Sequence, residues 1–521
     1  MVARYFSALV LIALAAALIA GCSSTDDDDD AVVDDDTIVD DDTIADDDTV
    51  VDDDTTVDDD TIIDDDTTVD DDSTVDDDTT VDDDTTVDDD TIIDDDTSVD
   101  DDTTEPAYVP LVDEVGRTII LHGANFMAIE AGGQPIDYQR MTDWGFNVVR
   151  ILITWQALEP APGVYDENYL PNVVEPQVQY AHDAGLNVIL DMHQYHWSSC
   201  CGGMGMPDWT CAELNDPPIE WLWQSGLFWD HDEYLDAFVA AWERVATYFA
   251  GDDRVYAYDL FNEPIAGART LWWIMDDQLL RPLYERLIAA VRAIHPEPLL
   301  IIEPGMLTVA GFPFTMTPLD AERVIYGPHL YPGTIAEGGG YTFPKTWIEK
   351  HLNRRQEESI EQGLPLLIGE TGLGSATANA EQYARDAVDL MEAKMAHWTW
   401  WAFGYDDNSM GLCDASGEPK EIFFRHLARP YPPATAGVLR SFHFETDTRI
   451  FTVDFDNRAG LAPGVEIFVN AGYHYPEGFA VSSTDADGTW NYSFDEATGR
   501  LSVQCDPDAA SHQITVAPET R

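Results

Sequence analysis

From residue 119 onward, short apolar runs alternate with longer amphipathic stretches. The apolar runs have the length of buried strands, and we expect eight: Ile119–His122, Asn147–Ile153, Asn187–Met192, Val255–Phe261, Leu299–Ile302, Arg323–Tyr326, Leu366–Ile368 and His397–Ala402. Helical spacing fills the intervals, for example at Asp232–Phe249, Trp272–Ile294, Ile348–Gln362 and Ala380–Lys394. This alternation predicts an α/β fold, a (β/α)8 TIM barrel over residues 105–432. The rival, an open doubly wound sheet, lacks a Gly-rich phosphate loop after its first strand.

The pattern changes after Pro430-Tyr431-Pro432-Pro433. Short runs with period-two alternation follow, separated by turn residues, which predicts a small C-terminal β-sandwich over residues 433–521. The expected strands are Ser441–Phe444, Ile450–Phe455, Glu466–Val469, Thr489–Phe494, Leu501–Gln504 and Gln513–Val516.

Residues 22–104 read as a spacer. After Asp26–Asp30, a six-residue unit such as Asp-Asp-Asp-Thr-Thr-Val (52–57) repeats, giving twelve Asp triplets without a single Lys or Arg. Like charges at this density repel each other, and no apolar face is available to form a core, so the composition predicts a disordered linker. The alternative is a calcium-binding repeat, but the unit lacks the glycine that a tight calcium loop requires.

The first residues have the pattern of a signal peptide, residues 1–21. Arg4 precedes a short apolar run, and Ile19-Ala20-Gly21-Cys22 resembles a bacterial lipobox. We therefore expect Cys22 to be lipidated and the protein to be exported, anchored to a bacterial membrane or cell surface. The alternative is an ordinary cleaved signal peptide with a chance Cys.

The formal net charge of −76 argues against nucleic-acid partners, because phosphates need basic side chains. Five cysteines remain after Cys22, and Cys211 could pair with either Cys200 or Cys201. Their spacing matches no structural zinc site. We expect no metal, no cofactor and a monomer.

Two carboxylates follow apolar runs at the expected carboxyl ends of strands four and seven. They are Glu263, in Asp259-Leu-Phe-Asn262-Glu263-Pro264, and Glu370, in Leu366-Leu-Ile-Gly369-Glu370-Thr371-Gly372. Active sites of such barrels lie at this face, so the two side chains should meet there.

With these motifs the chain resembles glycoside hydrolase family 5, over roughly residues 110–430. Other strand-end residues fit the pattern: Arg150, His193, His329, Tyr331 and Trp401. The resemblance implies a retaining glycosidase in which Glu263 is the acid/base and Glu370 the nucleophile. It also implies that Asn262, Arg150, His193, Asp191, His329, Tyr331 and Trp401 form the substrate-binding site; neighbouring Trp400 is the alternative sugar platform.

The chemistry sets an expectation for both carboxyl groups. Arg150 and Tyr331 should keep Glu370 ionised and oriented, because a nearby cation lowers a carboxylate pKa. Glu263, close to a second negative charge, should have a raised pKa and remain protonated.

Within the family the endoglycoceramidase-like branch is most similar, through Glu159-Pro-Ala-Pro-Gly-Val-Tyr165, Leu190-Asp191-Met192-His193-Gln194 and the sandwich after the barrel. Members of that branch cleave a glycan from a ceramide or similar lipid. The branch usually has an Asp where this chain has Tyr195, which affects glycan specificity. Residues 200–232, rich in Trp and Met, would either hold a lipid tail or pack on themselves.

Three functions compete. The resemblance favours a hydrolase of glycolipids, notably glycosphingolipids; the alternatives are an endo-β-glucanase that cleaves polysaccharide, and a carbohydrate-binding surface protein with an inactive barrel. Both carboxylates and their supporting residues are present, which argues against the inactive barrel.

Overall fold

The computed structural model describes residues 108–519, apart from 214–219, 268–271, 334 and 336–337. Cys22 and the Asp-rich tract therefore lie outside the described residues. Within the described part, no helix combines the length and apolar character that crossing a bilayer requires.

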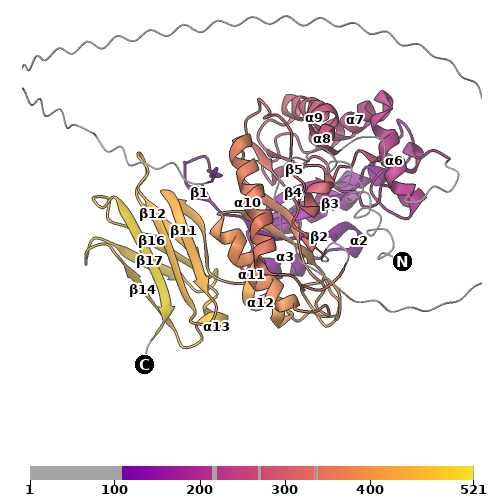
Figure 1. Ribbon diagram of the computed structural model, residues 1–521. Coiled ribbons are helices and arrows are strands. Elements are labelled where there is room, and N and C mark those ends of the chain that lie inside the picture. Colours follow the sequence, from indigo (N-terminus) through magenta and orange to yellow (C-terminus); the bar gives the residue numbers. More distant parts are fainter. Residues whose placement is uncertain (1–107, 214–219, 268–271, 334, 336–337, 520–521) are drawn as a thin grey trace, which may run out of the picture. The chain divides into compact units, whose positions relative to one another are not determined.

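Eight parallel strands form a barrel, as predicted (Figure 1). They are β2 His122–Phe126, β3 Val148–Ile153, β4 Asn187–Met192, β5 Val255–Asp259, β6 Leu299–Ile302, β7 Val324–Tyr326, β8 Leu367–Thr371 and β9 His397–Phe403. Hydrogen bonds join them in the order β7-β6-β5-β4-β3-β2-β9-β8, and a parallel bridge between Tyr326 and Leu366 closes the ring.

Helices separate the strands and cover the barrel. They are α2 Ala128–Ala131, α3 Pro135–Asp143, α4 Trp155–Leu158, α5 Glu175–Asp183, α6 Glu220–Trp229, α7 Asp232–Tyr248, α8 Trp272–Met275, α9 Arg281–Ile294, α10 Lys345–Gln362, α11 Ala380–Ala393 and α12 Glu421–Leu427. The predicted helix 272–294 is divided by a π-helical segment, Asp276–Leu280. Helix α10 ends where expected, because Gly363 adopts the left-handed conformation (φ 68°) that closes a helix.

The barrel interior changes from apolar to charged along the strands. Val148, Ile189, Ala257 and Ile301 belong to one apolar cluster inside the barrel. Side chains two residues apart on a strand point to the same face, so the next inward positions are Arg150, Asp191, Asp259 and Glu303. All four are buried. Four neighbouring strands thus place a layer of charged groups above the apolar floor, toward the carboxyl end of the barrel.

The sequence prediction placed the first barrel strand too early, at Ile119–His122. Thr118–Ile119 form β1, which pairs with β10 (Tyr431–Ala436) outside the barrel, and the barrel strand β2 begins only at His122. The apolar run Ile119–Leu121 contributes to both domains: Ile120 packs in the C-terminal core and Leu121 in the barrel.

The C-terminal domain is the predicted β-sandwich. One sheet has the order β1-β10-β13-β16-β15 and the other β11-β12-β17-β14. Beside β1 and β10 the strands are β11 Val438–Glu445, β12 Ile450–Asp456, β13 Gly464–Phe468, β14 Phe479–Ser483, β15 Asn491–Asp495, β16 Arg500–Gln504 and β17 Ser511–Pro518; a short helix, α13 Ala471–His474, precedes β14. The sequence prediction missed β14 and also β10, which contains Pro432 and Pro433 and pairs with both β1 and β13.

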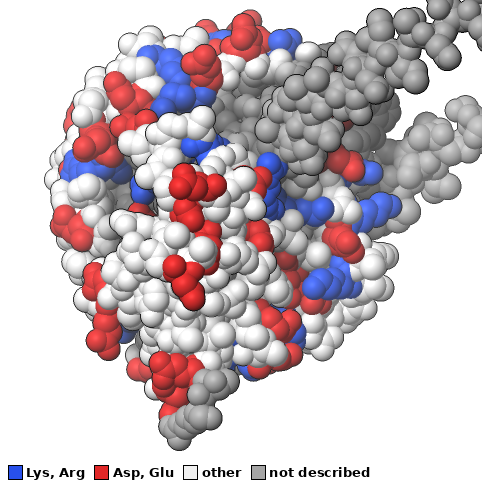
Figure 2. Space-filling model, turned by 90° about the vertical axis from the view of Figure 1, so that its left-hand side faces the viewer, with Lys and Arg blue, Asp and Glu red and all other residues white. Residues whose placement is uncertain are grey.

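Ring stacking joins this sandwich to the barrel. The ring centroid of His122 lies 4.0 Å from that of Tyr431 and 4.4 Å from that of Trp398 on β9. The Tyr431 hydroxyl also donates a hydrogen bond to the carbonyl of Gly145 (2.8 Å). On the face shown in Figure 2, acidic and basic side chains are interspersed, so this face offers no continuous basic surface for a polyanion.

Candidate active site

Arg150 lies at the centre of the charged layer and is completely buried. Its guanidinium contacts four carboxylates: Asp259 at 2.8 Å, Glu303 and Glu370 at 2.9 Å each, and Asp191 at 3.0 Å. It also donates hydrogen bonds to the side-chain oxygens of Asn125 (2.9 Å) and Asn262 (2.8 Å). Only the planar, five-donor fork of an Arg can connect so many groups from different strands.

Glu263 and Glu370 face each other across His329. His329 Nδ1 lies 2.9 Å from Glu263 Oε1 and 3.7 Å from Glu370 Oε2. One ligand atom from each of the three residues lies within 4.8 Å of the other two. The Tyr331 hydroxyl donates to Glu370 Oε2 at 3.2 Å. A close pair of carboxyl groups is the geometry of retaining glycosidases, whereas inverting enzymes hold them farther apart to admit a water molecule.

Our expectation for the two carboxyl pKa values was wrong. Burial raises the pKa of Glu263, but the hydrogen bond and positive charge of His329, together with Arg150, outweigh burial and leave this pKa below its usual value. Burial raises the pKa of Glu370, and the neighbouring Glu263 adds to this, so the net pKa lies above its usual value despite His329 and Arg150. The repulsion between the carboxylates is outweighed at Glu263 by the cation bonded to it.

His329 is that cation. Burial opposes its protonation, but Glu303, Glu370 and Glu263 outweigh burial and raise the pKa of the imidazole well above its ordinary value. We expected a proton on Glu263. The pKa shifts place it instead on His329, which is hydrogen-bonded to Glu263.

Glu303 is the functional residue that sequence reasoning missed. It is buried and follows directly after β6, whereas three residues separate Glu263 from the end of β5. Its Oε2 accepts the backbone N–H of Glu263 (2.7 Å), and its Oε1 lies 3.3 Å from His329 Nε2. Glu263 adopts a left-handed φ of 42°, and this hydrogen bond helps to hold that conformation. Inspecting the residue after every predicted strand would have found Glu303.

The predicted sugar-binding residues lie around this pair. His193 Nδ1 bonds Asp191 Oδ2 (2.8 Å), and the His193 ring lies parallel to Trp401, 5.6 Å away. Trp401 is partly exposed, whereas Trp400 is fully buried against Tyr383 and Phe423. The structure therefore removes the ambiguity between the two indoles, because only Trp401 can present a face to a ligand.

Three expected ligand contacts need revision or refinement. Arg150 and Asp191 have no exposed surface, so they support other side chains and do not touch a substrate. Asn262 is also buried; its Oδ1 accepts from Arg150 and its Nδ2 donates to the carbonyl of Gln194 (2.9 Å). One amide proton of Asn262 remains available for a sugar hydroxyl.

Some of these groups have the types and spacing of metal ligands. In the described part of the chain they include Asp191, Asp259 and Glu303, and a second set in the sandwich, Asp485, Cys505 and His512. The first set already surrounds the Arg150 guanidinium, which occupies the place of a cation. In the second set, His512 is bonded to Asp485 on one ring nitrogen and to Asn457 on the other, so its ring is engaged within the fold.

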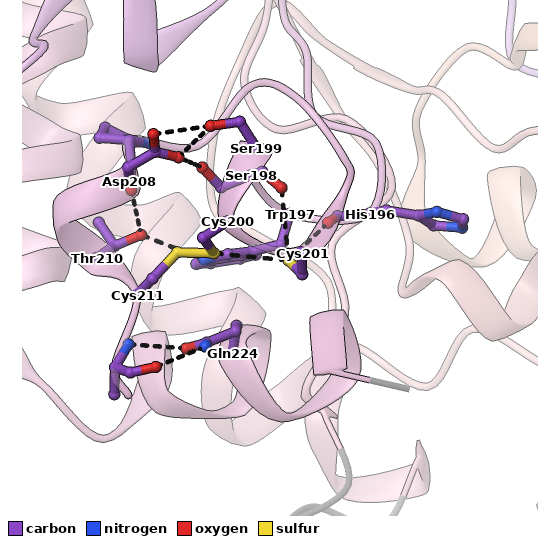
Figure 3. The surroundings of a disulfide bond; sticks show 12 residues. His196, Trp197, Ser198, Ser199, Cys200, Cys201, Asp208, Thr210, Cys211 and Gln224 are labelled. Carbon is purple, nitrogen blue, oxygen red and sulfur yellow. Dashed lines mark hydrogen bonds between the residues drawn. A yellow bond between two sulfur atoms is a disulfide. The ribbon is translucent and has the colours of Figure 1, made fainter. Parts of the chain in front are cut away.

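The disulfide alternatives are resolved as Cys200–Cys211, which closes the loop after β4 (Figure 3). Cys201 is free, and so are the buried Cys413 and Cys505. Asp208 accepts hydrogen bonds from Ser198 and Ser199 inside the same loop. The segment predicted to be apolar thus starts with a covalently closed turn.

Known proteins share both domains. The cellulase family profile (glycosyl hydrolase family 5) matches residues 112–407, and the profile of the glycoside hydrolase family 5 C-terminal domain matches residues 429–516. Endoglycoceramidase I of Rhodococcus hoagii (strain 103S) is 29% identical over 417 residues, covering 71% of this chain and 80% of that protein. Endoglucanase A of Evansella cellulosilytica is 23% identical over 314 residues, covering 58% and 53%.

Among solved structures, endo-glycoceramidase II from Rhodococcus sp. superposes with a TM-score of 0.69 at 26% identity, covering 79% of this chain and all of that one. Structures of that enzyme include a lactosyl–enzyme intermediate and a complex with ganglioside GM3. A covalent glycosyl–enzyme intermediate belongs to the retaining mechanism. Sequence, fold and the paired carboxylates agree, and the chain belongs to glycoside hydrolase family 5 as a retaining glycosidase of its endoglycoceramidase-like branch.

Proposed function

We propose that this enzyme cleaves the β-glycosidic bond between a glycan and a lipid, as in glycosphingolipids. The observation that carries this proposal is the extent of the similarity. It runs through barrel and sandwich and covers 80% of endoglycoceramidase I, against 53% of the endoglucanase. The polysaccharide alternative is therefore the less favoured outcome of the test below.

In the first step, Glu370 attacks the anomeric carbon while Glu263 protonates the leaving oxygen. Arg150 and Tyr331 hold one carboxylate oxygen each, which fixes the direction of attack. His329 supplies the proton to Glu263 across their 2.9 Å hydrogen bond, so Glu263 is protonated, and His329 neutral, at the moment when the leaving group needs the proton.

In the second step, Glu263 takes a proton from water, and the hydroxide attacks the glycosyl ester. Glu370 leaves as a carboxylate, which Arg150 stabilises, and the proton returns to the Glu263–His329 pair. Two inversions at the anomeric carbon give overall retention.

The sugar at the cleaved bond would rest on Trp401, with hydroxyls bound by Asn262 and His193. The Asp191 bond to Nδ1 leaves His193 Nε2 as the atom for this contact. The partly exposed indole of Trp401 provides an apolar face for the ring.

We further propose export and anchoring through a lipidated Cys22, with residues 26–104 as a tether, and a monomeric enzyme. The support is the lipobox-like sequence and the repeated Asp triplets. Such a tether would leave the enzyme mobile over a lipid-rich surface, where amphiphilic substrates are concentrated.

The substrate test is an incubation with ganglioside, glucosylceramide and carboxymethyl cellulose, followed by analysis of released oligosaccharide, glucose and ceramide. We expect glycan and ceramide to appear together from at least one glycolipid. Faster hydrolysis of carboxymethyl cellulose than of any glycolipid would replace the proposal with the glucanase function.

The roles of the carboxylates are tested separately. Glu370→Gln should abolish turnover, and a 2-fluoro glycoside should label Glu370 of the unmodified enzyme. Glu263→Gln should slow substrates with poor leaving groups by about 10²–10⁴-fold and activated aryl glycosides far less. NMR should show the β anomer as the first-formed sugar. Labelling of another residue, or release of the α anomer, would contradict the assignment.

A further inference from the structure

Three aromatic rings form a stack beside the acid/base. The ring of Tyr195 lies 3.9 Å from that of His196 at an interplanar angle of 20°, and His196 lies 4.9 Å from Trp221 at 12°. Trp221, on α6, is 5% exposed, whereas Tyr195 is 43% exposed. One end of the stack is therefore fixed in the fold, and the outer face of Tyr195 is open.

The backbone is specifically shaped to make this stack. Neighbouring side chains of an extended chain point to opposite sides, but His196 and Trp197 both have left-handed φ angles, 52° and 73°. The turn brings Tyr195 and His196 face to face. Non-glycine residues seldom adopt this conformation without surrounding restraints, and such positions concentrate at functional sites.

Those restraints are visible around Trp197. Its backbone N–H donates to Gln194 Oε1 (3.0 Å), and its buried indole donates to Thr210 (3.2 Å). The Cys200–Cys211 disulfide closes the same loop, and the His196 ring projects away from it (Figure 3). The loop thus fixes the backbone from which the rings of Tyr195 and His196 extend.

Hydrogen bonds tie this segment to the acid. Gln194 Nε2 donates to the backbone carbonyls of Asn262 (3.1 Å) and Glu263 (3.0 Å), so Tyr195 is attached to the strand end that carries the acid/base. Together with burial, the charge of Glu263 also raises the pKa of Tyr195, as expected for a nearby group. An acid that protonates the leaving oxygen has the leaving group beside it.

The exposed end of the stack is the neutral ring of Tyr195. Among the described residues, no hydrogen bond engages the Tyr195 hydroxyl. An uncharged ring loses no charge hydration when hydrocarbon covers it.

We propose that Tyr195, supported by His196 and Trp221, is the platform for the apolar stem of the leaving group. This subsite rests on the proposed function, because it presupposes an amphiphilic glycoside. The ligand class is a β-glycoside whose aglycone begins with an alkyl chain. The outer face of Tyr195 packs against the first carbons of that chain.

The test compares methyl and octyl β-lactoside, which share a glycone and differ only in the alkyl chain, with octyl lactoside kept below its micelle concentration. The measured quantity is the ratio of kcat/KM for octyl over methyl, because a general loss of activity cancels in this ratio. Tyr195→Ala and Tyr195→Asp should lower the ratio about tenfold. Tyr195→Phe, which keeps the ring, should preserve it. Tyr492→Ala, an exposed tyrosine of the sandwich, is the matched control.

An unchanged ratio in Tyr195→Ala would overturn the proposal. So would an equal loss on both lactosides, which would make Tyr195 a contact for the glycan. If the wild-type enzyme hydrolyses neither lactoside, calorimetry on the Glu370→Gln protein still decides: the platform requires octyl lactoside to bind more tightly than methyl lactoside, and this preference to fall with Tyr195→Ala. Failure of turnover thus counts against the proposed function, and loss of the chain-length effect against the platform.

Discussion

At the residue scale, the active site contains more acidic than basic side chains. Five acidic side chains, Asp191, Asp259, Glu263, Glu303 and Glu370, surround Arg150 and His329. Asp259 relieves part of the excess, because burial raises its pKa well above the usual value, against the effect of Arg150. Removing one partner of such a buried cluster typically costs about 3–5 kcal/mol, so the cluster is both a catalytic and a structural centre.

The first prediction concerns Glu303→Gln, which keeps the size of the side chain and removes its charge. Glu303 is one of the carboxylates that raise the pKa of His329. Without that charge the imidazolium should deprotonate at lower pH, which moves the basic limb of the kcat/KM profile to lower pH. The profile should be measured beside Glu358→Gln, a buried carboxylate outside the site. An unmoved basic limb would mean that His329 does not supply the acid's proton.

The same shift predicts how stability depends on pH. A folded-state pKa above the unfolded value means that His329 contributes fully below about pH 6.5, and that its contribution is lost as pH rises through the folded pKa. The melting temperature of the wild type should therefore fall over that window. In Glu303→Gln the fall should begin at the same pH, because the unfolded pKa is unchanged, but it should end at lower pH and be smaller, which thermal scans at several pH values would detect.

At the element scale, the loop after β4 and helix α6 together form one side of the site. The apolar side chains of this region are not equivalent. Phe228 is fully buried, with Trp155, Trp197 and Phe238 around it, whereas Trp223 is partly exposed. Phe228 is thus a core residue, and a substitution there would report on folding rather than on a lipid tail.

The disulfide gives a prediction at this scale. Cys211→Ser opens a loop of 11 residues, and the loss of the crosslink should cost up to roughly 3 kcal/mol locally. Amides between Trp197 and Thr210 should then exchange with solvent up to about 100-fold faster, as hydrogen–deuterium exchange can measure. Cys201→Ser, at a free thiol in the same loop, is the control. Equal exchange in both variants would show that the loop is held by packing alone.

At the scale of the whole molecule, the barrel and the sandwich share a core. Ile120 and Met395 of the barrel domain pack in the same apolar cluster as Tyr431 and Leu439 of the sandwich. Tyr431→Ala should therefore lower the free energy of unfolding by about 3–5 kcal/mol, and unfolding should remain a single transition. Calorimetry would show this, with Tyr492→Ala as an exposed control. Two separate transitions, with the barrel unaffected, would contradict the shared core.

The Asp-rich tract supplies the remaining prediction. Its composition offers no apolar surface to dock on the enzyme. Deletion of residues 26–104 should leave the melting temperature, and the kinetics on soluble substrates, nearly unchanged. A large fall in either quantity would mean that the repeat packs on the catalytic domain.

The sequence by itself determined the barrel and the two carboxylates, because both follow from local patterns. Buried strands appear as apolar runs, and the residue after each run must lie at the carboxyl end of the barrel. Period-two alternation also places Arg150, Asp191 and Asp259 on the same side of their own strands as Val148, Ile189 and Ala257, but the register between strands that joins them in one layer comes from the structure.

Only the tertiary structure decided the rest, because those features depend on distances between strands. Trp400 and Trp401 differ by one position, and the packing of β9 decides which of them is buried. Cys211 is joined to Cys200 rather than Cys201 by the course of the loop. Whether the proton lies on His329 or on Glu263 depends on the 2.9 Å distance between them, a contact between residues 66 positions apart. Electrostatic energies vary steeply with such separations, and a linear pattern of residue types does not contain them.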